Sequence, residues 1–600
     1  MLSELINSTT ATVLRHRHHL IPTASSEIAD RDVRRVLQLI QESPILGQLK
    51  EWKANDRRGP GGRPAHVSDH ALLVGLVLAA LLGTTHLSSV HDVLFNRVSH
   101  RMRRELGLVE WRFRDGPRVF DHIWEASSYR NVVDAFSRIV ALMDPSLLPK
   151  NRVMNGPDYE HFAQMWDRRC RVEPEIANQR LRWFANEMIE ISIRALPREV
   201  RRAWNGSVAI DGTPIRAFAR PDRRPAGSKA RNQRVLLRSS ADPDAGYYIR
   251  AGDHAGDRSN EPLSKMSWAY ESTFAVMVHD DPSSPAPYPH LVVGMAVLDR
   301  PGTEPARQAV KVLESVAERG HPSKWLVVDN LFPNQKPEKF QLPIRELGYE
   351  PVFEYTSGQQ GIAAEYHGAI QVEGRWYCPQ MPPALISASL DRANGTISDQ
   401  LYRERITMRI AYEFRPNGKT GTDGSQRMLC PAAGTSPTVK CSLKPESIKS
   451  PRPMPVVISS GRQSRDIPKV CRQATIKMHA GVGAKFKQEI RFGSDEWTKL
   501  YRTSRSVNEG MNGVAKRPNP IDISDPNIRR VRGVAAQTIL HAVQLTVINL
   551  ERIRTYLHSR IRDPEGLIKA DRRGKRSERS KVFSPRGPSL KRSTGPPALV

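Results

Sequence analysis

Three acidic residues from separate parts of the sequence have the context of metal ligands. Asp211 ends the apolar segment VAID, and Asp329 ends the apolar segment WLVVD. Both segments are typical of buried strands, and carboxylates at the ends of two strands of one sheet would lie side by side. Glu509, in the segment YRTSRSVNEGMNGVAK, is the candidate third carboxylate, carried on a helix. Because an Asp after a strand is more often a turn former or a helix cap, the prediction depends on the combination.

A set of carboxylates like this suits chemistry on phosphodiester bonds. Hard oxygen ligands favour Mg²⁺ or Mn²⁺, and two such ions about 3.5–4 Å apart can activate the attacking oxygen and stabilise the leaving oxygen. We therefore expect Asp211, Asp329 and Glu509 to be both catalytic and metal-binding. Asp299, which follows the apolar segment LVVGMAVL, is the alternative to Asp329. Asp329 is preferred because it comes after a predicted crossover helix.

The overall charge points to a polyanionic partner. The 600 residues include 91 Lys and Arg against 63 Asp and Glu, a formal net charge of +28. Nucleic acid is the obvious candidate. With 39% hydrophobic residues, the chain as a whole is not expected to be disordered, and its length is enough for several domains.

The segments that would carry the two aspartates predict a mixed α/β core. Strands are expected at 207–215, 270–278, 291–298, 324–330 and 349–355, with helices at 302–320 and 338–347. The order strand, strand, strand, helix, strand, helix, strand predicts a ribonuclease-H-like (retroviral-integrase-like) fold. We assign the first part of this core to residues 201–355 and its C-terminal helices to 494–558, with an insertion at 356–493 before the last catalytic helix.

The N-terminal part is expected to be helical. Residues 1–66 contain a helix and a basic linker, and 67–200 form a helical region. Two helices joined at 83–85, the second continuing to Arg104, predict a helix-turn-helix that binds DNA ends through its basic terminus. A plain helical hairpin is the alternative. At the other end, residues 559–600 carry a dense Lys and Arg load and are expected to form a disordered tail.

The segment around Glu509 resembles the signature of a group of bacterial insertion-sequence DDE transposases. In that group an Arg precedes the catalytic Glu by four residues and a Lys follows it by seven, the spacing of Arg505, Glu509 and Lys516. On a helix these side chains share one face. The segment VAIDGTPI is similar to the strand of the family's first Asp, and residues 333–355 resemble the segment after its second Asp.

Two features depart from the family pattern. The family places a Tyr three residues before the Arg, where this chain has Arg502, with Tyr501 one residue earlier. Relatives usually follow the second Asp with Arg or Lys and then place a Tyr two residues later. This chain instead continues with Asn330, Leu331 and Phe332.

The resemblance implies a transposase that cuts DNA strands and joins them to target DNA with the help of Mg²⁺ or Mn²⁺. Asp211, Asp329 and Glu509 would hold the metal, while Arg505 and Lys516 would bind DNA phosphate. The implied partners are double-stranded DNA, as terminal inverted repeats and as target, and a second copy of the chain. The alternatives are a ribonuclease-H-like nuclease without joining activity and an inactive DNA-binding protein descended from a transposase.

The cysteines suggest a possible second metal site and indicate the redox state of the cellular compartment. Four of the five fall in the predicted insertion and could form a structural zinc site, although none is in a Cys-x₂-Cys pair and small buried cysteines are the alternative: Cys378, Cys430, Cys441 and Cys471. Sparse, odd-numbered cysteines favour a reducing compartment. The longest apolar run, 71–83, is shorter than the roughly 20 residues of a membrane span. We expect a cytoplasmic, nucleoid-associated protein without a membrane partner.

Overall fold

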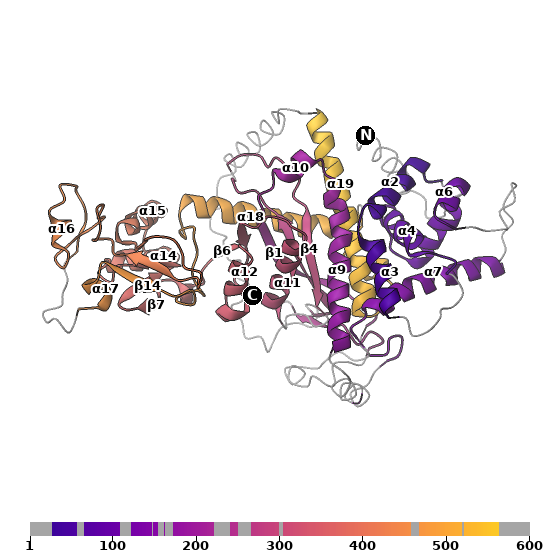
Figure 1. The fold of residues 1–600 in the computed structure, drawn as a ribbon, viewed down its shortest axis with the longest axis horizontal. Helices are drawn as coiled ribbons and strands as arrows, with labels where there is room; N and C mark the ends of the chain where they lie inside the picture. Colours follow the sequence, from indigo (N-terminus) through magenta and orange to yellow (C-terminus); the bar gives the residue numbers. More distant parts are fainter. Residues whose placement is uncertain are drawn as a thin grey trace, which may run out of the picture.

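The chain combines a helical N-terminal part, a central mixed sheet, and a module of short strands and helices at one end (Figure 1). The computed structural model describes residues 27–56, 65–108, 122–146, 148–153, 161, 172–220, 240–249, 266–281, 283–298, 304–457, 467–518 and 521–562. Mixed α/β architecture was the prediction, and at this level it is confirmed.

The central sheet has six strands: β1 (Val208–Arg216), β2 (Gly246–Ile249), β3 (Met266–Met277), β4 (Val292–Leu298), β5 (Trp325–Val327) and β6 (Glu350–Val352). They lie in the order β2-β3-β1-β5-β6, and β4 pairs with β3 as well. β3 is antiparallel to both β1 and β4, whereas β1, β5 and β6 run parallel. Every predicted strand is confirmed in this sheet, and β2 is an addition to them.

Helix α11 (Pro305–Glu318) covers one face of the sheet. It begins with a proline, whose missing N–H costs nothing in the first turn, and its apolar residues pack against β3 and β4. A side chain at Gly294 of β4 would come within 3.0 Å of Val316 and 3.1 Å of Val312. The glycine therefore lets α11 approach the sheet closely. Helix α12 (Gln341–Glu346) follows between β5 and β6.

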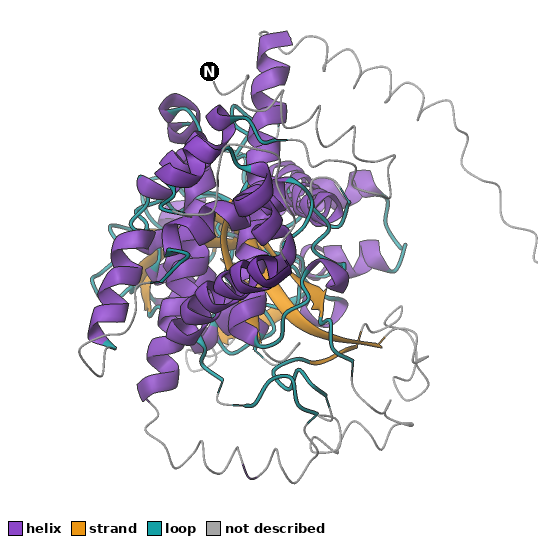
Figure 2. Cartoon of the chain, turned by 90° about the vertical axis from the view of Figure 1, so that its right-hand side faces the viewer, coloured by secondary structure: helices purple, strands orange, loops and turns teal. Residues whose placement is uncertain are grey.

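Three long helices lie on the other face: α9 (Val172–Arg194), α18 (Asp495–Ala515) and α19 (Val534–Arg562). α9 and α19 pack along each other and against β4, while α18 packs against β1, β3 and β5. Seen from the side of the N-terminal helices, the strands lie behind a layer of helices (Figure 2). Buried amides connect these layers. Asn549 of α19 bonds both the N–H and the carbonyl of Val292, and Asn186 of α9 bonds both those of Met295. Such satisfied buried amides fix the helices relative to the strand.

The N-terminal helices form a common core with α9 and α19. They are α2 (Asp30–Gln41), α3 (Ile45–Asn55), α4 (Asp69–Leu81), α5 (Leu87–Asp92), the π-helical turn η2 (Val93–Arg97), α6 (His100–Glu105) and α7 (His122–Met143), with the short α10 (Arg198–Arg202) before β1. The apolar run of α4 is buried, as predicted. None of the helices that the structure describes has the length and apolar character needed to cross a membrane.

One prediction for this region is wrong. The second helix of the expected helix-turn-helix does not continue unbroken to Arg104. Val98 has an extended backbone, and the hydroxyl of Ser99 then accepts a hydrogen bond that caps the new helix α6. Arg103, in the basic end of this segment, donates to the carbonyl of Phe95.

The inserted module has its own small core. Its strands are β7 (Ile362–Tyr366), β8 (Ala369–Val372), β9 (Arg375–Tyr377), β10 (Arg415–Pro416), β11 (Gln426–Leu429), β12 (Lys440–Cys441), β13 (Val456–Val457) and β14 (Thr475–Met478). Its helices are α13 (Pro383–Ile386), α14 (Ala388–Ala393), α15 (Asp399–Met408), α16 (Pro445–Ile448) and α17 (Lys469–Arg472). The chain returns to the central sheet along α18 (Figure 1).

A glycine holds β1 close to the segment before β5. Gly206 has φ +95°, and a Cβ there would lie 2.2 Å from the backbone oxygen of Pro322. We expect Gly206→Ala to lower the free energy of unfolding by about 3 kcal/mol or more, measured by urea denaturation. Gly320→Ala is the matched control, because Gly320 has φ +75° but open space around it, and it should cost about 1 kcal/mol. Equal costs would refute the importance of the contact.

Candidate active site

The structure brings the two predicted aspartates to neighbouring parallel strands. The expectation that Asp211 ends its strand is wrong, because β1 continues to Arg216 and Asp211 pairs with Phe274 of β3, whereas Asp329 does follow the end of β5. Ala209 of β1 is in register with Val327 of β5. Asp211 and Asp329 each lie two residues further on, so both project on the same face of the sheet. Their charges interact, because the carboxylate of Asp329 raises the pKa of Asp211.

Asp211 is held by three neighbours. Its Oδ1 accepts a hydrogen bond from the N–H of Gly212 at 2.9 Å, and its Oδ2 accepts one from Nδ2 of Asn512 at 3.3 Å. Nη1 of Arg505 lies 3.9 Å from the same Oδ2. Burial nevertheless raises the pKa of Asp211 to about 6, and Arg505 opposes this shift. Asp211 is thus a half-buried carboxylate with less positive charge around it than its ionised form requires.

Asp329 begins a turn after β5. Its Oδ1 accepts a hydrogen bond from the N–H of Leu331 at 3.0 Å, so the turn-forming role is present. Burial raises the pKa of Asp329, although the bond from Leu331 and the charge of Arg505 oppose the shift. Only Oδ1 of Asp329 accepts the hydrogen bond of the turn, so the turn does not prevent Asp329 from lying near Asp211.

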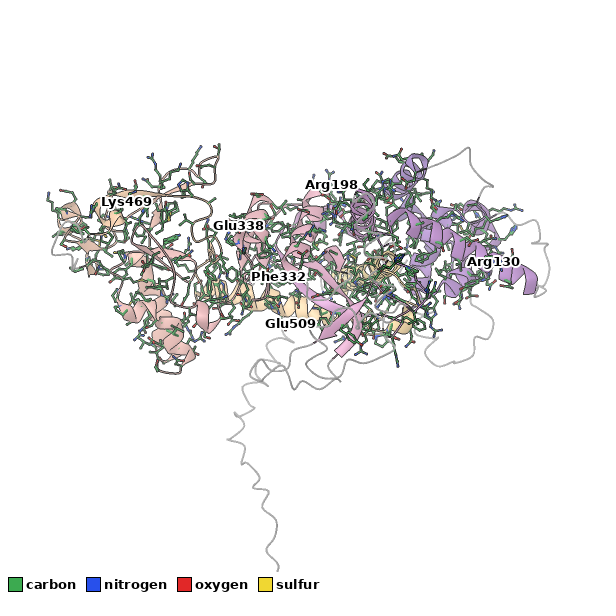
Figure 3. The ribbon with its side chains drawn as sticks, turned by 90° about the horizontal axis from the view of Figure 1, so that it is seen from below. Arg130, Arg198, Phe332, Glu338, Lys469 and Glu509 are labelled. Atoms are coloured by element: carbon green, nitrogen blue, oxygen red, sulfur yellow. The ribbon has the colours of Figure 1, made fainter. Side chains whose placement is uncertain are left out.

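Glu509 reaches the same region from α18. The hydroxyl of Ser494 caps this helix by accepting from the N–H of Trp497 at 3.1 Å. Nη2 of Arg505 lies 3.7 Å from Oε1 of Glu509, so Arg505 stands between Glu509 and Asp211. The Glu509 side chain is 67% exposed. Figure 3 shows it in the central part of the molecule, away from Lys469 of the insertion.

Lys516 caps the C-terminus of α18 and is close enough to Asp211 for its charge to lower the pKa of that carboxyl. The two predicted cations, Arg505 and Lys516, therefore act on the same carboxylate. Asp329, Arg505 and Lys516 thus lie near Asp211, and Glu509 is connected to Asp211 through Arg505.

The donor set fits Mg²⁺ or Mn²⁺ in its chemistry. In the described part of the chain, no three His, Cys, Asp or Glu side chains are close enough together to hold an ion as they stand. A cation would nevertheless stabilise the two half-buried carboxylates, since burial raises the pKa of both and the charge of Asp329 adds to the shift at Asp211. Beneath them, polar side-chain atoms of Ser504, Asn508 and Asn512 are buried without a hydrogen-bond partner. These atoms mark a polar environment suited to bound water or a ligand.

Two residues near the site had no assigned role in the sequence interpretation. Asn512 is three residues after Glu509, on the same helix face, but nothing in the sequence signals its bond to Asp211. Tyr501 stacks on Trp497, with ring centroids 4.8 Å apart. Burial, followed by Glu354, raises the pKa of Tyr501 to about 12, and Asp329 and Glu509 contribute to the shift. Tyr501 thus lies beside the carboxylates, one position before the place expected from the resemblance.

No protein-family model, curated protein or solved structure matches the chain. Assignment of function therefore depends on the geometry of these residues.

The alternative second ligand, Asp299, lies outside the described residues. The strand that it follows, β4, ends at Leu298 and pairs with β3 rather than with β1. β5, which leads to Asp329, pairs directly with β1. The sheet order therefore favours Asp329.

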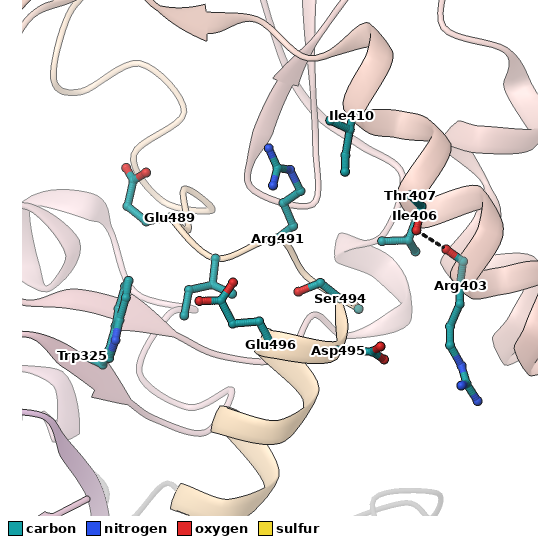
Figure 4. A pocket seen from close by; sticks show the side chains of 12 residues that line it. Trp325, Arg403, Ile406, Thr407, Ile410, Glu489, Arg491, Ser494, Asp495 and Glu496 are labelled. Atoms are coloured by element: carbon teal, nitrogen blue, oxygen red, sulfur yellow. Dashed lines mark hydrogen bonds between the residues drawn. The ribbon is translucent and has the colours of Figure 1, made fainter. Parts of the chain in front are cut away.

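One cavity beside the core is separate from the carboxylates. It has a volume of about 260 Å³ and lies between α15 and the segment that enters α18 (Figure 4). Asp495 lines it at the start of α18, 14 residues before Glu509, which is about 21 Å along a helix. Two of its charged residues form ion pairs, Arg491 with Glu413 at 2.7 Å and Glu489 with Lys487 at 2.9 Å. We interpret it as the joint between the insertion and the core.

The raised pKa of Asp211 predicts how pH and Mg²⁺ change the stability of the folded chain. Because the pKa of Asp211 rises from 3.8 to about 6 on folding, the metal-free chain should lose stability as the pH rises through this window. At pH 7 we expect Asp211→Asn to melt at a higher temperature than the unmodified chain. Saturating Mg²⁺ should raise the melting temperature of the unmodified chain by about 5 °C and leave the variant unchanged.

Asp280→Asn is the control for this measurement. Although burial opposes it, hydrogen bonds from Lys324, Ser207 and Asn205 hold the pKa of Asp280 below its ordinary value. Its replacement should therefore lower the melting temperature and leave the response to Mg²⁺ intact. An unchanged Mg²⁺ response in Asp211→Asn would contradict a metal site at Asp211.

Proposed function

We propose that the chain is a DDE transposase that cuts and joins DNA strands at Asp211, Asp329 and Glu509. One observation carries the proposal: two half-buried aspartates, one on β1 and one just after its parallel neighbour β5, face a helix that presents a glutamate and a shared arginine. Phosphodiester chemistry needs several carboxylates at one place and cations for the phosphate. Asp211, Asp329 and Glu509 provide the carboxylates, and Arg505 and Lys516 provide the cations.

The order of the strands supports a ribonuclease-H-like core. Apart from the short β2, the strands lie in the order third, second, first, fourth, fifth along the chain, with antiparallel pairing among the first three and parallel pairing beyond. This is the arrangement expected of that fold. It places the first aspartate on the central strand and the second on its parallel neighbour.

Each residue has a role in this proposal. Asp211, Asp329 and Glu509 would hold Mg²⁺ or Mn²⁺, which when bound supplies the charge that activates water and stabilises a leaving oxygen. Arg505 and Lys516 would hold the phosphate next to the carboxylates. Asn512 fixes the orientation of the Asp211 carboxylate through its hydrogen bond. The net charge of +28 favours association with DNA, and we propose that two copies of the chain act together on paired DNA ends.

A strand-joining assay tests the proposal. The substrate is a labelled duplex carrying the terminal sequence of the DNA element that encodes the chain, mixed with a supercoiled target plasmid and Mg²⁺. We expect labelled plasmid from the unmodified chain and none from Glu509→Gln. Cutting without joining would indicate a ribonuclease-H-like nuclease, and binding without cutting would indicate an inactive DNA-binding protein.

A further inference from the structure

The second feature that the sequence singled out lies in the inserted module, far from the carboxylates. Four cysteines from four separate segments line one small cavity there: Cys378, Cys430, Cys441 and Cys471. None is in a disulfide, three are buried, and Cys471 is half-buried. Burial raises the pKa of Cys378 to about 12, and the other three thiols are near enough to add to this shift.

The backbone around two of these cysteines directs N–H groups at the sulfur atoms. The N–H of Gln380 donates to the sulfur of Cys378, and the N–H of Ala432 donates to the sulfur of Cys430. Donors directed at a ligand sulfur are the usual outer contacts of a metal-bound cysteine. Uncharged thiols that served only as packing would have no need of them.

The turns after three of the cysteines share one backbone hydrogen bond. In each, the N–H of the residue three positions later donates to the cysteine carbonyl: Met381 to Cys378 at 3.0 Å, Ala433 to Cys430 at 2.9 Å, and Lys444 to Cys441 at 2.9 Å. A repeated tight turn at separate places in the module indicates a shared local requirement. Such a requirement would be to direct the cysteine sulfur, together with a backbone N–H, toward a common metal ion.

We propose that these four cysteines bind one structural zinc ion. Zinc prefers four thiolates in a tetrahedron, with each sulfur about 2.3 Å from the ion. The cavity of about 20 Å³ has room for one ion, and an iron–sulfur cluster would need more space. No three of the described ligand-type side chains are yet close enough to hold an ion, so the sulfurs must move inward, which rotation of each Cβ–S arm allows.

The charge balance supports this assignment. Each sulfur that becomes a ligand releases its proton to solvent, so a zinc ion with four thiolates carries a charge of −2. Lys444 lines the same cavity, and its charge favours the ionised forms of Cys430 and Cys471. A lysine beside a thiolate site partly offsets the cost of burying that charge.

A bound zinc ion would also stabilise the inserted module. Its strands are short, with two residues each in β10, β12 and β13, and its core contains several of the cysteines themselves. Modules with small cores commonly depend on a metal or on disulfides. One zinc ion would tie β9, β11, β12 and α17 together. This inference does not depend on the proposed DNA chemistry.

Metal analysis of the full-length chain tests the inference. Protein purified without chelators from zinc-supplemented cells should contain one zinc ion per chain by elemental analysis. Replacement of zinc by Co²⁺ should give the intense near-ultraviolet absorption of thiolate-to-cobalt charge transfer. Removal of the metal should make the four thiols react with an alkylating reagent at least about ten-fold faster.

Two variants and a matched control assign the ligands. Cys378→Ser and Cys471→Ser should each lower zinc affinity by at least about ten-fold. Cys170→Ser, which changes the cysteine outside the described residues, should keep full zinc content. Zinc content equal to that of the unmodified chain in both variants, a disulfide between any two of the four, or failure of the metal-free unmodified chain to take up Zn²⁺ or Co²⁺ would overturn the proposal.

Discussion

Asp211→Asn is expected to lower the rate of strand cleavage at a DNA end by about a thousand-fold. Loss of a central carboxylate from the metal-binding set removes about 4 kcal/mol of transition-state stabilisation, which corresponds to that factor. The change is nearly isosteric, and the variant should fold, because the pKa of Asp211 shows that its ionised form is unfavourable in the metal-free chain. Cleavage of a labelled duplex under single-turnover conditions measures the effect.

DNA binding separates this chemical defect from a general loss of function. Asp211→Asn removes a negative charge beside the proposed phosphate contacts, so its affinity for the same duplex should be equal or higher. Asp281→Asn, a change in an exposed loop after β3, should keep full cleavage activity. A cleavage rate for Asp211→Asn within ten-fold of the unmodified rate would contradict its catalytic role.

Asp329→Asn should be as severe as Asp211→Asn, and Asp299→Asn should be close to neutral. Asp329 follows the strand that pairs with β1, whereas Asp299 follows β4, which pairs with β3. We expect losses of about a thousand-fold for Asp329→Asn and less than about three-fold for Asp299→Asn in the same assay.

The opposite result for these two variants would contradict the assignment of Asp329 as the second ligand. If Asp299→Asn abolished cleavage and Asp329→Asn did not, the second ligand would be Asp299, and the sheet would not be the frame of the site. The melting temperatures of both variants should be recorded with the activities, because Asp329 also accepts the hydrogen bond of a turn. A loss of activity with an unchanged melting temperature indicates chemistry rather than folding.

The core strands could be predicted because each is an apolar run between clear breakers, as WLVVD is. β2 could not, since GYYI has only four residues and its strand conformation depends on pairing with the start of β3. The break at Val98 is similarly a matter of tertiary packing, as the local pattern continues the helix. Local propensity yields to tertiary contacts in such places.

Some features of the candidate site could likewise be predicted from the sequence, whereas others depend on the fold. The residue types of Asp211 and Glu509 and their local surroundings are visible in the sequence, but their proximity depends on α18 crossing the sheet. The bond from Asn512 to Asp211 had no signal, because one more polar residue on a half-exposed helix face is unremarkable. The grouping of the four cysteines was an open possibility in the sequence, which left small buried cysteines as the alternative, and the folded module brings all four to one cavity.

The central claim is that Asp211, Asp329 and Glu509 form one metal site. Iron-directed cleavage tests it: Fe²⁺ takes the place of Mg²⁺ at carboxylate sites, and with ascorbate and peroxide it cuts the nearby backbone. We predict cuts clustered near positions 211, 329 and 509, suppressed by excess Mg²⁺ and absent in Asp211→Asn. Cuts near only one of the three positions, or cuts that persist in Asp211→Asn, would contradict the shared site.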